Sequence, residues 1–199
     1  MSERSSRLVQ AAEPVMARLC EQLDGSAVWG MLLDKDCLQL GESVGSKTFT
    51  EINASRGSRP GAVFSEHLVG TNGAAMSVEL LKSSIVIGPE HFRDSEQNLV
   101  SVGAPVRDSM NRLVGVLSLN AYYAAASSLL EPFARDIAWA IRERLGEEAE
   151  RGEREIFALF TRLSQRPSQP VLAMSEKIFI ANRAAYQSFG NNGEIESIT

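Results

Sequence analysis

The sequence is poor in cysteine and has no long apolar run, and each shortage excludes a class of protein. Two cysteines, Cys20 and Cys37, are too few for a disulfide framework, and we interpret them as small buried hydrophobic residues rather than as a redox pair. No stretch approaches the roughly 20 apolar residues that span a bilayer. The first residues, MSERSSRLVQAAEP, have no apolar run of the signal-peptide type. We therefore expect a soluble, cytoplasmic protein that does not contact a membrane.

Clustered basic charge is also missing. The chain has 20 Lys and Arg against 25 Asp and Glu, a formal net charge of -5, and no basic block. Nucleic-acid binding through phosphates and polybasic membrane anchoring both need such a block. There is also no G-x-x-x-x-G-K phosphate loop and no recognition helix. We expect no direct DNA contact by this segment, and any output function would lie outside it.

The sequence offers little for metal or covalent chemistry. Its two histidines occur in the pairs Glu66-His67 and Glu90-His91. Adjacent side chains point in different directions, and zinc needs a tighter Cys/His set. There is no G-x-S-x-G nucleophile motif and no Cys–His pairing. We therefore predict no catalytic residue, no metal and no cofactor.

What is present is a regular succession of periodic segments. Alternating and helical hydrophobic patterns predict these elements: a helix over Arg7–Leu23 that starts or kinks at Pro14, strands over Ala27–Leu33 and Cys37–Leu40, a loop over Gly41–Gly61 with a helical turn near Phe49–Ala54, a helix from Gly73 to about Lys82, a strand over Ser83–Ile87, a helical segment around His91 and Phe92, strands over Leu99–Val106 and Arg112–Asn120, and a long helix from Ala124 to about Leu163. Strands over Pro170–Met174 and Lys177–Ile180 and a helix over Asn182–Phe189 follow.

Two of the strands are apolar on both faces, which indicates a sheet covered on both sides. We predict an α+β fold with a central antiparallel sheet flanked by helices on both faces. The charged segment 146–154 is polar all round, as expected of a helix that bridges domains through solvent. The sequence GTNG supplies turn and cap residues, because a Thr or Asn side chain can cap the helix that follows. The residues assigned to this turn and cap role are Glu66, Gly70, Thr71, Asn72 and His91.

The middle of the chain resembles a known family. The segments PGAVFSEHLVGTNG, GPEHF and VGAPVRDSMNRLVGVLSL follow in the order seen in the N-terminal GAF domain of bacterial enhancer-binding regulators. The similar regulators are of the acetoin and dihydroxyacetone type, which act with the sigma-54 form of RNA polymerase. The sequence departs from the family pattern at Phe64, Ser101, Gly103 and Asn111, where tryptophan, cysteine, alanine and glycine are usual.

The last segment, QPVLAMSEKIFIANRAAYQSF, resembles the opening of a PAS domain, in which Asn182 starts the first helix. The two resemblances imply a GAF sensory domain over 1–145, a linker (signalling) helix over 146–167 and an incomplete PAS-like segment over 168–199. They imply a sensory input module of a transcription regulator, which binds a small-molecule effector or a metabolic-enzyme partner and relays the signal through a homodimeric helix.

Two alternatives stay open. The GAF domain could be a protein-interaction platform without its own ligand, which docks a metabolic enzyme. It could also be a methionine sulfoxide reductase of the GAF kind, although that chemistry needs several reactive cysteines. A small-molecule pocket between the sheet and the helices is the functional hypothesis that we favour. Its candidate residues could equally fill the core: Trp29, Phe64, Met76, Phe92, Ser101, Gly103 and Leu117.

Overall fold

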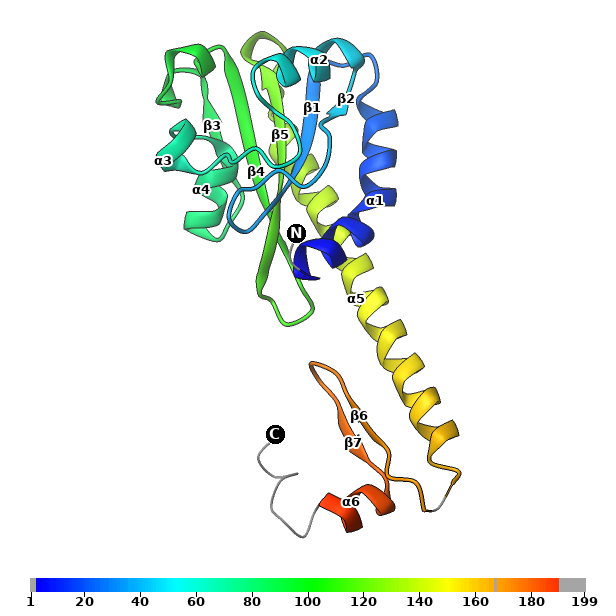
Figure 1. The fold of residues 1–199 in the computed structure, drawn as a ribbon. Coiled ribbons are helices and arrows are strands. Elements are labelled where there is room, and N and C mark those ends of the chain that lie inside the picture. Colours follow the sequence, from blue (N-terminus) through cyan, green and yellow to red (C-terminus); the bar gives the residue numbers. More distant parts are fainter. Residues whose placement is uncertain (1–2, 167, 190–199) are drawn as a thin grey trace. The chain divides into compact units, whose positions relative to one another are not determined.

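A five-stranded antiparallel sheet in the order β2-β1-β5-β4-β3 organises the first part of the chain (Figure 1). The computed structural model describes residues 3–166 and 168–189, and the chain divides into two units, 1–146 and 147–199. The predicted α+β class with a central antiparallel sheet is confirmed. The five strands are β1 (Val28–Asp34), β2 (Val44–Gly45), β3 (Ser84–Ile87), β4 (Leu99–Arg107) and β5 (Leu113–Tyr122).

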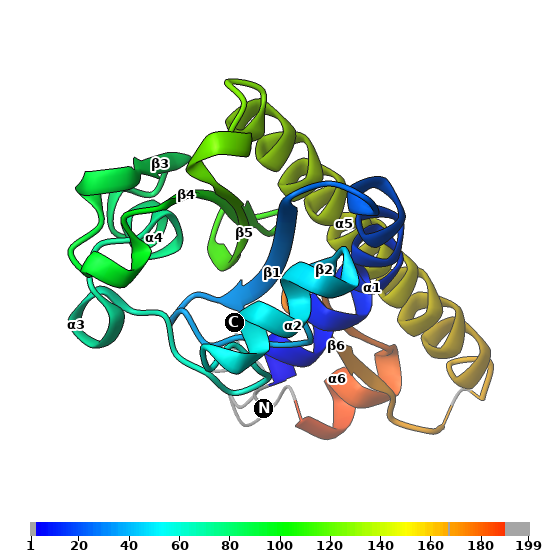
Figure 2. The same cartoon turned by 90° about the horizontal axis from the view of Figure 1, so that it is seen from above.

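Helices cover both faces of this sheet, as the two-sided apolar strands predicted. The first unit contains α1 (Glu3–Leu23), α2 (Lys47–Ser55), α3 (Glu66–Val69), α4 (Gly73–Leu80) and the first half of α5 (Leu130–Leu163). Its 3-10 turns are η1 (Gly88–Glu90), η2 (Asp94–Glu96) and η3 (Tyr123–Ala125). The view along the strands shows α1 and α5 on one face and α2, α3 and α4 toward the other (Figure 2).

Strand alternation divides the core into two clusters, because successive side chains in a strand point to opposite faces. The cluster under α1 and α5 contains Leu117 and Leu119 of β5, Val100 and Val102 of β4, and Ile141 of α5. The cluster on the other face contains residues at the alternate positions of these strands, such as Leu99 and Val116, together with Trp29 and Met31. Leu117 therefore lies on the opposite face of the sheet from Trp29, so these two predicted pocket residues cannot line one cavity.

The apolar stripe of α1 is used inside the unit. Leu8, Ala12, Leu19 and Leu23 are buried against the sheet and α5. The helix is continuous through Pro14, and its axis changes direction partway along in Figure 1. A proline inside a helix removes one backbone hydrogen bond, so it accounts for such a bend. The apolar stripe of this helix is thus covered within the first unit.

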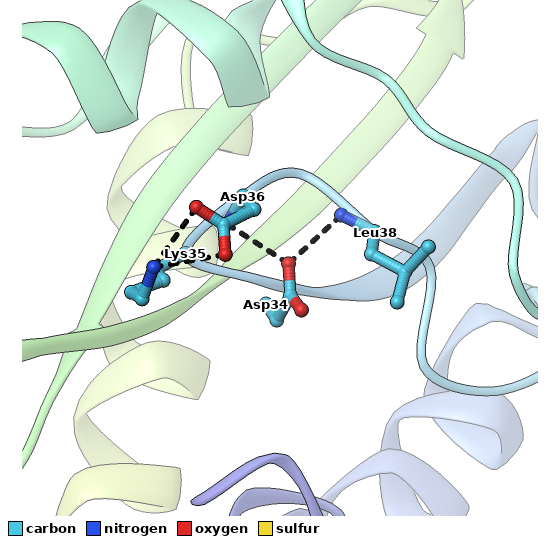
Figure 3. A network of polar contacts seen from close by, with 4 residues as sticks. All are labelled: Asp34, Lys35, Asp36 and Leu38. Atoms are coloured by element: carbon cyan, nitrogen blue, oxygen red, sulfur yellow. Dashed lines mark hydrogen bonds and ion pairs between the residues drawn. The ribbon is translucent and has the colours of Figure 1, made fainter. Parts of the chain in front are cut away.

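The predicted strand Cys37–Leu40 is wrong in its extent, because only isolated bridges at Leu38 and Gln39 occur there. The turn after β1 prevents a regular hairpin. Asp34 accepts hydrogen bonds from the N–H groups of Asp36 and Leu38 at 2.9 Å, and Lys35 pairs with Asp36 beside it (Figure 3). Cys37 is held at φ 61°, the left-handed region. Strand β2, which the sequence did not indicate, pairs with β1 instead.

Most of the remaining element predictions hold with shifted ends. The helical turn expected near Phe49–Ala54 is α2, and the paired strands β4 and β5 are close to their predicted ranges. The segment around His91 and Phe92 is not helical, because the 3-10 turn η1 ends before them. The short helix α3 was not predicted, and α5 begins at Leu130 rather than at Ala124.

The β4–β5 turn is held by Asp108. Its carboxylate accepts the N–H groups of Met110 and Arg112 at 2.9 Å and the Arg112 side chain at 2.6 Å. Partial burial raises the pKa of Asp108, but the hydrogen bonds and charge of Arg112 and the N–H of Met110 lower it by more, so the pKa lies below its ordinary value. The loop that joins the two strands is therefore tied to itself.

The second unit contains the rest of α5 and a strand–strand–helix segment. The hairpin β6 (Leu172–Met174) and β7 (Phe179–Ala181) is followed by α6 (Arg183–Phe189), as predicted. Asn182 joins these pieces, because its side chain accepts from the N–H of Val171 at 3.1 Å and of Ala185 at 2.9 Å. The part of the predicted PAS-like segment after Phe189 lies outside the described residues.

None of the helices in the described part of the chain is both long enough and apolar enough to span a bilayer.

Candidate ligand cavity

A cavity of about 110 Å³ lies on the face of the sheet that carries α2, α3 and α4. Its floor comes from β1, β4 and β5, and its walls come from α2, the segments around α3, the start of α4 and the segment after η1. The lining residues are Trp29, Met31, Leu33, Asn53, Arg56, Ser58, Phe64, Val69, Thr71, Asn72, Ala74, His91, Arg93, Glu96, Leu99, Ser101, Ser118 and Asn120.

Strand register builds the floor of the cavity. Ser101 of β4 pairs with Asn120 of β5, and Asn120 pairs with Trp29 of β1, so these three side chains stand in one row. Ser118 and Met31 belong to the next row. Each of these residues is at most 6% exposed. Polar and aromatic side chains are therefore brought together on a surface that is otherwise apolar.

Trp29 is the largest group in the floor and carries an unused hydrogen-bond donor. Its ring stacks with Phe49 of α2 at 6.2 Å between centroids and contacts Tyr122 at 5.9 Å. These rings fix the indole by packing. Its Nε1–H group is buried and has no hydrogen-bond partner among the described residues. A buried tryptophan N–H usually has a partner, so this donor marks a place where a ligand or water can bind.

One wall is a polar network built on Ser58, which is buried despite lying in a loop. Ser58 donates to Gln39 at 2.8 Å and contacts the sulfur of Met31 at 3.3 Å. Asn53 of α2 also approaches that sulfur, at 3.5 Å, and donates to Ser43 at 3.1 Å. This network fixes the loop after α2 against the sheet, so the wall does not depend on α2 alone.

The start of α4 closes another side. Asn72 caps the helix by accepting from the N–H of Ala75 at 3.0 Å, and its amide donates to the carbonyls of Phe64 and Gly70, also at 3.0 Å. The predicted cap is therefore confirmed. Ser101 accepts the N–H of Gly73 at 3.1 Å, which fastens the first turn of α4 to β4. Both interactions satisfy N–H groups that a helix end leaves free.

Charged groups stand at the rim. Arg93 donates to the carbonyl of Leu68 at the end of α3, and Arg56 and Glu96 complete the rim. His91 is 4% exposed, and its Nδ1 lies 3.1 Å from the carbonyl oxygen of Gly88. His91 thus holds a turn, as predicted, and it also forms part of the wall. Glu66 accepts from Thr71 at 3.0 Å across the α3–α4 turn.

The structure brings together three of the seven predicted pocket residues, because Trp29, Phe64 and Ser101 all line the cavity. Met76 is half-buried on α4, where Ala74 lines the cavity instead. Phe92 is 79% exposed and packs on Gly70 outside the cavity. Leu117, as described above, is in the core on the other face.

Gly103 is covered by the first turn of α4. A Cβ atom built on Gly103 would lie 2.1 Å from the carbonyl oxygen of Gly73. The space left by this glycine is thus filled by helix backbone and does not open into the cavity.

Several lining residues were missed, and some carried a usable signal. Met31 follows Trp29 by two residues, so strand alternation places both on one face. Ser118 and Asn120 are polar residues at alternate positions of an apolar strand, a pattern that marks a site. Asn53 and Ser58 come from a segment whose path over the sheet has no such pattern.

Nothing in this cavity is arranged for covalent chemistry. Cys37 is 3% exposed, and burial, with smaller contributions from the charges of Asp34 and Asp36, raises the pKa of its thiol to about 11. It is therefore a protonated thiol near neutral pH. Cys20 is exposed on α1, contrary to the prediction that both cysteines are buried. Within residues 3–166 and 168–189, no three His, Cys, Asp or Glu residues are grouped to hold a metal ion.

Comparison with known sequences gives a family model and two named transcriptional activators that are similar to this chain. Residues 2–143 match the family described as the N-terminal domain of MimR. The propane 2-monooxygenase operon transcriptional activator MimR of Mycolicibacterium goodii is 28% identical over 182 residues, and its namesake in Mycolicibacterium smegmatis is 26% identical. Each match covers 91% of this chain and 31% of the relative. The chain therefore spans about a third of the length of these transcriptional activators, which are regulators rather than enzymes.

Comparison with solved structures supports the fold. The chain is similar to the crystal structure of the E. coli DhaR(N)-DhaL complex, with a TM-score of 0.76 and 16% identity, over 92% of this chain and 64% of that one. An IclR homologue of Microbacterium hydrocarbonoxydans complexed with 4-hydroxybenzoate is more distant, with a TM-score of 0.52 and 17% identity, over 72% of this chain and 70% of that one. At these identities the likeness concerns the fold alone.

Proposed function

The chain belongs to the MimR N-terminal domain family, and on that premise we propose that it is the sensory domain of a transcriptional activator that binds a small organic effector in the cavity beside Trp29. Its curated relatives are transcriptional activators. The observation that carries the proposal is the buried indole N–H of Trp29, which has no partner among the described residues and belongs to a side chain that lines a cavity of about 110 Å³. Buried tryptophan donors usually have a hydrogen-bond partner, which a ligand oxygen would supply here.

The cavity indicates the class of ligand. An apolar cavity of about 150 Å³ admits benzene, so this one suits a molecule of about four to six non-hydrogen atoms. Its deep surface carries neutral polar groups, Ser101, Ser118 and Asn120, and the charged side chains stand at the rim. We therefore propose a neutral ligand with one hydrogen-bond acceptor, such as a small ketone or alcohol, whose oxygen accepts from Trp29.

A thermal-shift screen tests this proposal. A panel of small neutral ketones, alcohols, ethers and matched hydrocarbons is added to the purified chain. Saturation at about a hundred times Kd stabilises the folded state by about 2.7 kcal/mol, which raises Tm by roughly 5–10 °C for a domain of this size. Failure of every oxygen-bearing compound to raise Tm would overturn direct sensing in this cavity.

Two tryptophan variants give the residue-level test. Trp29→Phe keeps an aromatic ring but removes the N–H donor, so it lowers affinity for the ligand about fivefold or more. Trp139→Phe on α5 is the matched control, because it is the other tryptophan of the chain and does not line the cavity. Equal losses in the two variants would refute the hydrogen bond to Trp29.

We further propose that the ligand acts on α5. Ser101 lies between Val100 and Val102, which pack in the cluster that contains Ile137 and Ile141 of α5. Cavity and helix are thus separated by one layer of backbone, and a ligand that shifts β4 changes the packing under α5. Amide hydrogen exchange of α5 should slow when the ligand binds. Unchanged exchange at a saturating concentration would rule out this route.

We propose, as the sequence predicted, that the chain forms a homodimer through α5. In the second unit Phe157, Leu159 and Leu163 of α5 are each at least 39% exposed. Leu159 and Leu163 are at i and i+4, so they lie on one side of the helix, and exposed apolar residues at this spacing favour pairing with a second helix. Light scattering should give a dimer mass, and the mass should halve in the double variant Leu159→Glu with Leu163→Glu. A monomer of the unmodified chain at high concentration would refute it.

A second candidate function is docking of a metabolic enzyme without a ligand. The observation in its favour is the fold shared with the DhaR(N)-DhaL complex, in which a related domain is bound to another protein. Exposed side chains such as Phe92 and Leu68 offer apolar contact area near the cavity rim. A null ligand screen together with retained binding to an enzyme encoded beside the activator would favour this candidate over the first.

A further inference from the structure

On the face opposite the cavity, we propose that a groove between α5 and the β4 strand binds an acidic segment of a partner protein. The groove has a volume of about 190 Å³ and lies within the first unit. Its lining residues are Ser83, Ala104, Pro105, Arg107, Arg135, Ala138, Trp139 and Arg142. Arginine and tryptophan make up half of this lining, and no acidic residue takes part.

The α5 side of the groove is a single stripe. Arg135, Ala138, Trp139 and Arg142 are spaced at i, i+3, i+4 and i+7, so they lie along one side of the helix. Trp139 is 57% exposed, and the guanidinium carbon of Arg142 lies 5.0 Å from its ring centroid. This contact holds the arginine over the ring, and among the described residues no acceptor occupies its N–H groups, which can therefore bind an anion.

Within residues 3–166 and 168–189, the positive charge of this stripe is not neutralised by an ion pair. Neither Arg135 nor Arg142 forms an ion pair with any carboxylate of the described residues. Glu131 is one helical turn before Arg135 and could have paired with it, but it accepts from Ser83 at 2.7 Å. The positions one turn from Arg142 are Ala138 and Gly146, which carry no charge.

Arg107 adds a third positive charge at the strand side. Its guanidinium donates to the carbonyl of Leu81 at 2.7 Å and of Asn111 at 3.0 Å. Carbonyl groups orient the side chain without cancelling its charge. The chain as a whole has a net charge of -5, so this groove is a local surface of the opposite sign. Charge complementarity thus selects an acidic partner and steers its approach.

The shape favours a protein segment over a free small anion. Tryptophan and arginine are the residue types that most often dominate binding energy at protein interfaces. The groove joins three guanidinium groups to the exposed ring and to the apolar surfaces of Ala104, Pro105 and Ala138. A peptide with several carboxylates and an apolar side chain fits this combination. The inference is independent of the cavity, which lies on the other face.

The test uses the whole chain and a fluorescent peptide that combines several glutamates with one leucine. Its counterpart carries glutamine at every glutamate position. Fluorescence anisotropy at low salt should show saturable binding of the acidic peptide and at least about tenfold weaker binding of its counterpart. Arg142→Glu and Trp139→Ala should each weaken the acidic peptide about fivefold or more. Affinity should fall as salt shortens the range of the attraction.

Arg18→Glu on α1 is the matched control, because it makes the same charge change at an exposed arginine away from the groove. It should leave the affinity within about twofold, since exposed charges separated by more than about 10 Å are largely screened. An equal loss of affinity in Arg18→Glu would show that the effect comes from net charge alone, and it would refute the proposed site. Equal binding of both peptides, or no binding at millimolar peptide, would also overturn it. Citrate and sodium chloride are also compared as competitors at equal ionic strength. Displacement of the peptide by citrate but not by sodium chloride would identify a free polycarboxylate as the occupant and refute docking.

Discussion

Replacing Gly103 by alanine tests how α4 is seated on the sheet, and therefore how the cavity is closed. The added Cβ atom would lie 2.1 Å from the carbonyl oxygen of Gly73, 2.6 Å from its carbonyl carbon and 2.7 Å from the Cβ of Ser77. Ordinary contacts of a Cβ atom begin near 3.4 Å, so the first overlap exceeds 1 Å. Two of the three atoms are backbone, and they cannot move by rotating a side chain.

The cost follows from what must shift. Extra methylenes in a packed core typically cost about 1–3 kcal/mol, and occasionally more. Here the helix has to withdraw from β4, which also lengthens the 3.1 Å bond from the Gly73 N–H to Ser101. A lost bond of this kind in a buried place adds about 1–3 kcal/mol. We therefore expect Gly103→Ala to lower the free energy of unfolding by about 3 kcal/mol or more.

Urea unfolding followed by far-UV circular dichroism measures this change, with Gly146→Ala as the matched control. Gly146 lies inside α5, has no atom near the position of an added Cβ, and has an ordinary helical φ. Alanine there should stabilise the chain by up to about 1 kcal/mol, because it is the better helix former. The change from glycine to alanine is thus predicted to lower the free energy of unfolding at position 103 and to raise it at position 146. A Gly103→Ala variant within about 0.5 kcal/mol of the unmodified chain would refute the close packing of α4 on β4.

Three further predictions concern local groups. Asn72→Ala removes the cap that accepts from Ala75 at 3.0 Å, and should lower the urea midpoint by an amount equal to about 1–2 kcal/mol; an unchanged midpoint would contradict the cap. The pKa of Asp108 is lowered on folding, so its stabilisation is present above the unfolded pKa of about 3.9 and is lost as pH falls through the folded pKa. Asp108→Asn should therefore destabilise the chain at neutral pH, with a difference that shrinks below about pH 4; a difference that is constant with pH would count against this. Cys20 is exposed and Cys37 is buried with a thiol pKa of about 11, so a disulfide reagent at neutral pH should modify one thiol before unfolding and both after it; rapid modification of both would show that the loop opens.

The regular elements could be predicted because their patterns are local. Strands β4 and β5 are long, mostly apolar runs, and α4 follows Asn72, a residue type that commonly caps helices. Strand β2 could not be predicted, since Val44–Gly45 is two residues long and exists only through pairing with β1. The failure of the Cys37–Leu40 strand has the same kind of cause, because the carboxylate of Asp34 competes for the N–H groups that a hairpin would use.

The cavity was predictable only in part, for a geometric reason. Trp29 and Ser101 share a row because β5 lies between β1 and β4, and strand order is not written in either segment alone. Leu117 was assigned to the pocket although Val116 and Ser118, its neighbours, are the residues on that face. Because successive side chains of a strand point to opposite faces, an error of one residue places the predicted side chain on the face away from the cavity. Phe92 is aromatic, but its backbone turns it outward.

Small residues in the middle of a sheet leave space, and the packing of other elements decides what occupies it. Gly103 and Ser101 stand two residues apart on one face of β4, yet their surroundings differ. The backbone of Gly73 lies directly over Gly103 and fills the space there. At Ser101 the helix has only begun, and its first N–H is taken by the serine hydroxyl, so no further element enters. The next group along that row beyond Asn120 is Trp29, with its unpaired donor. The hydrogen bond from the Gly73 N–H to Ser101 therefore fixes α4 on β4 and also lies at the boundary between the first turn of the helix and the cavity.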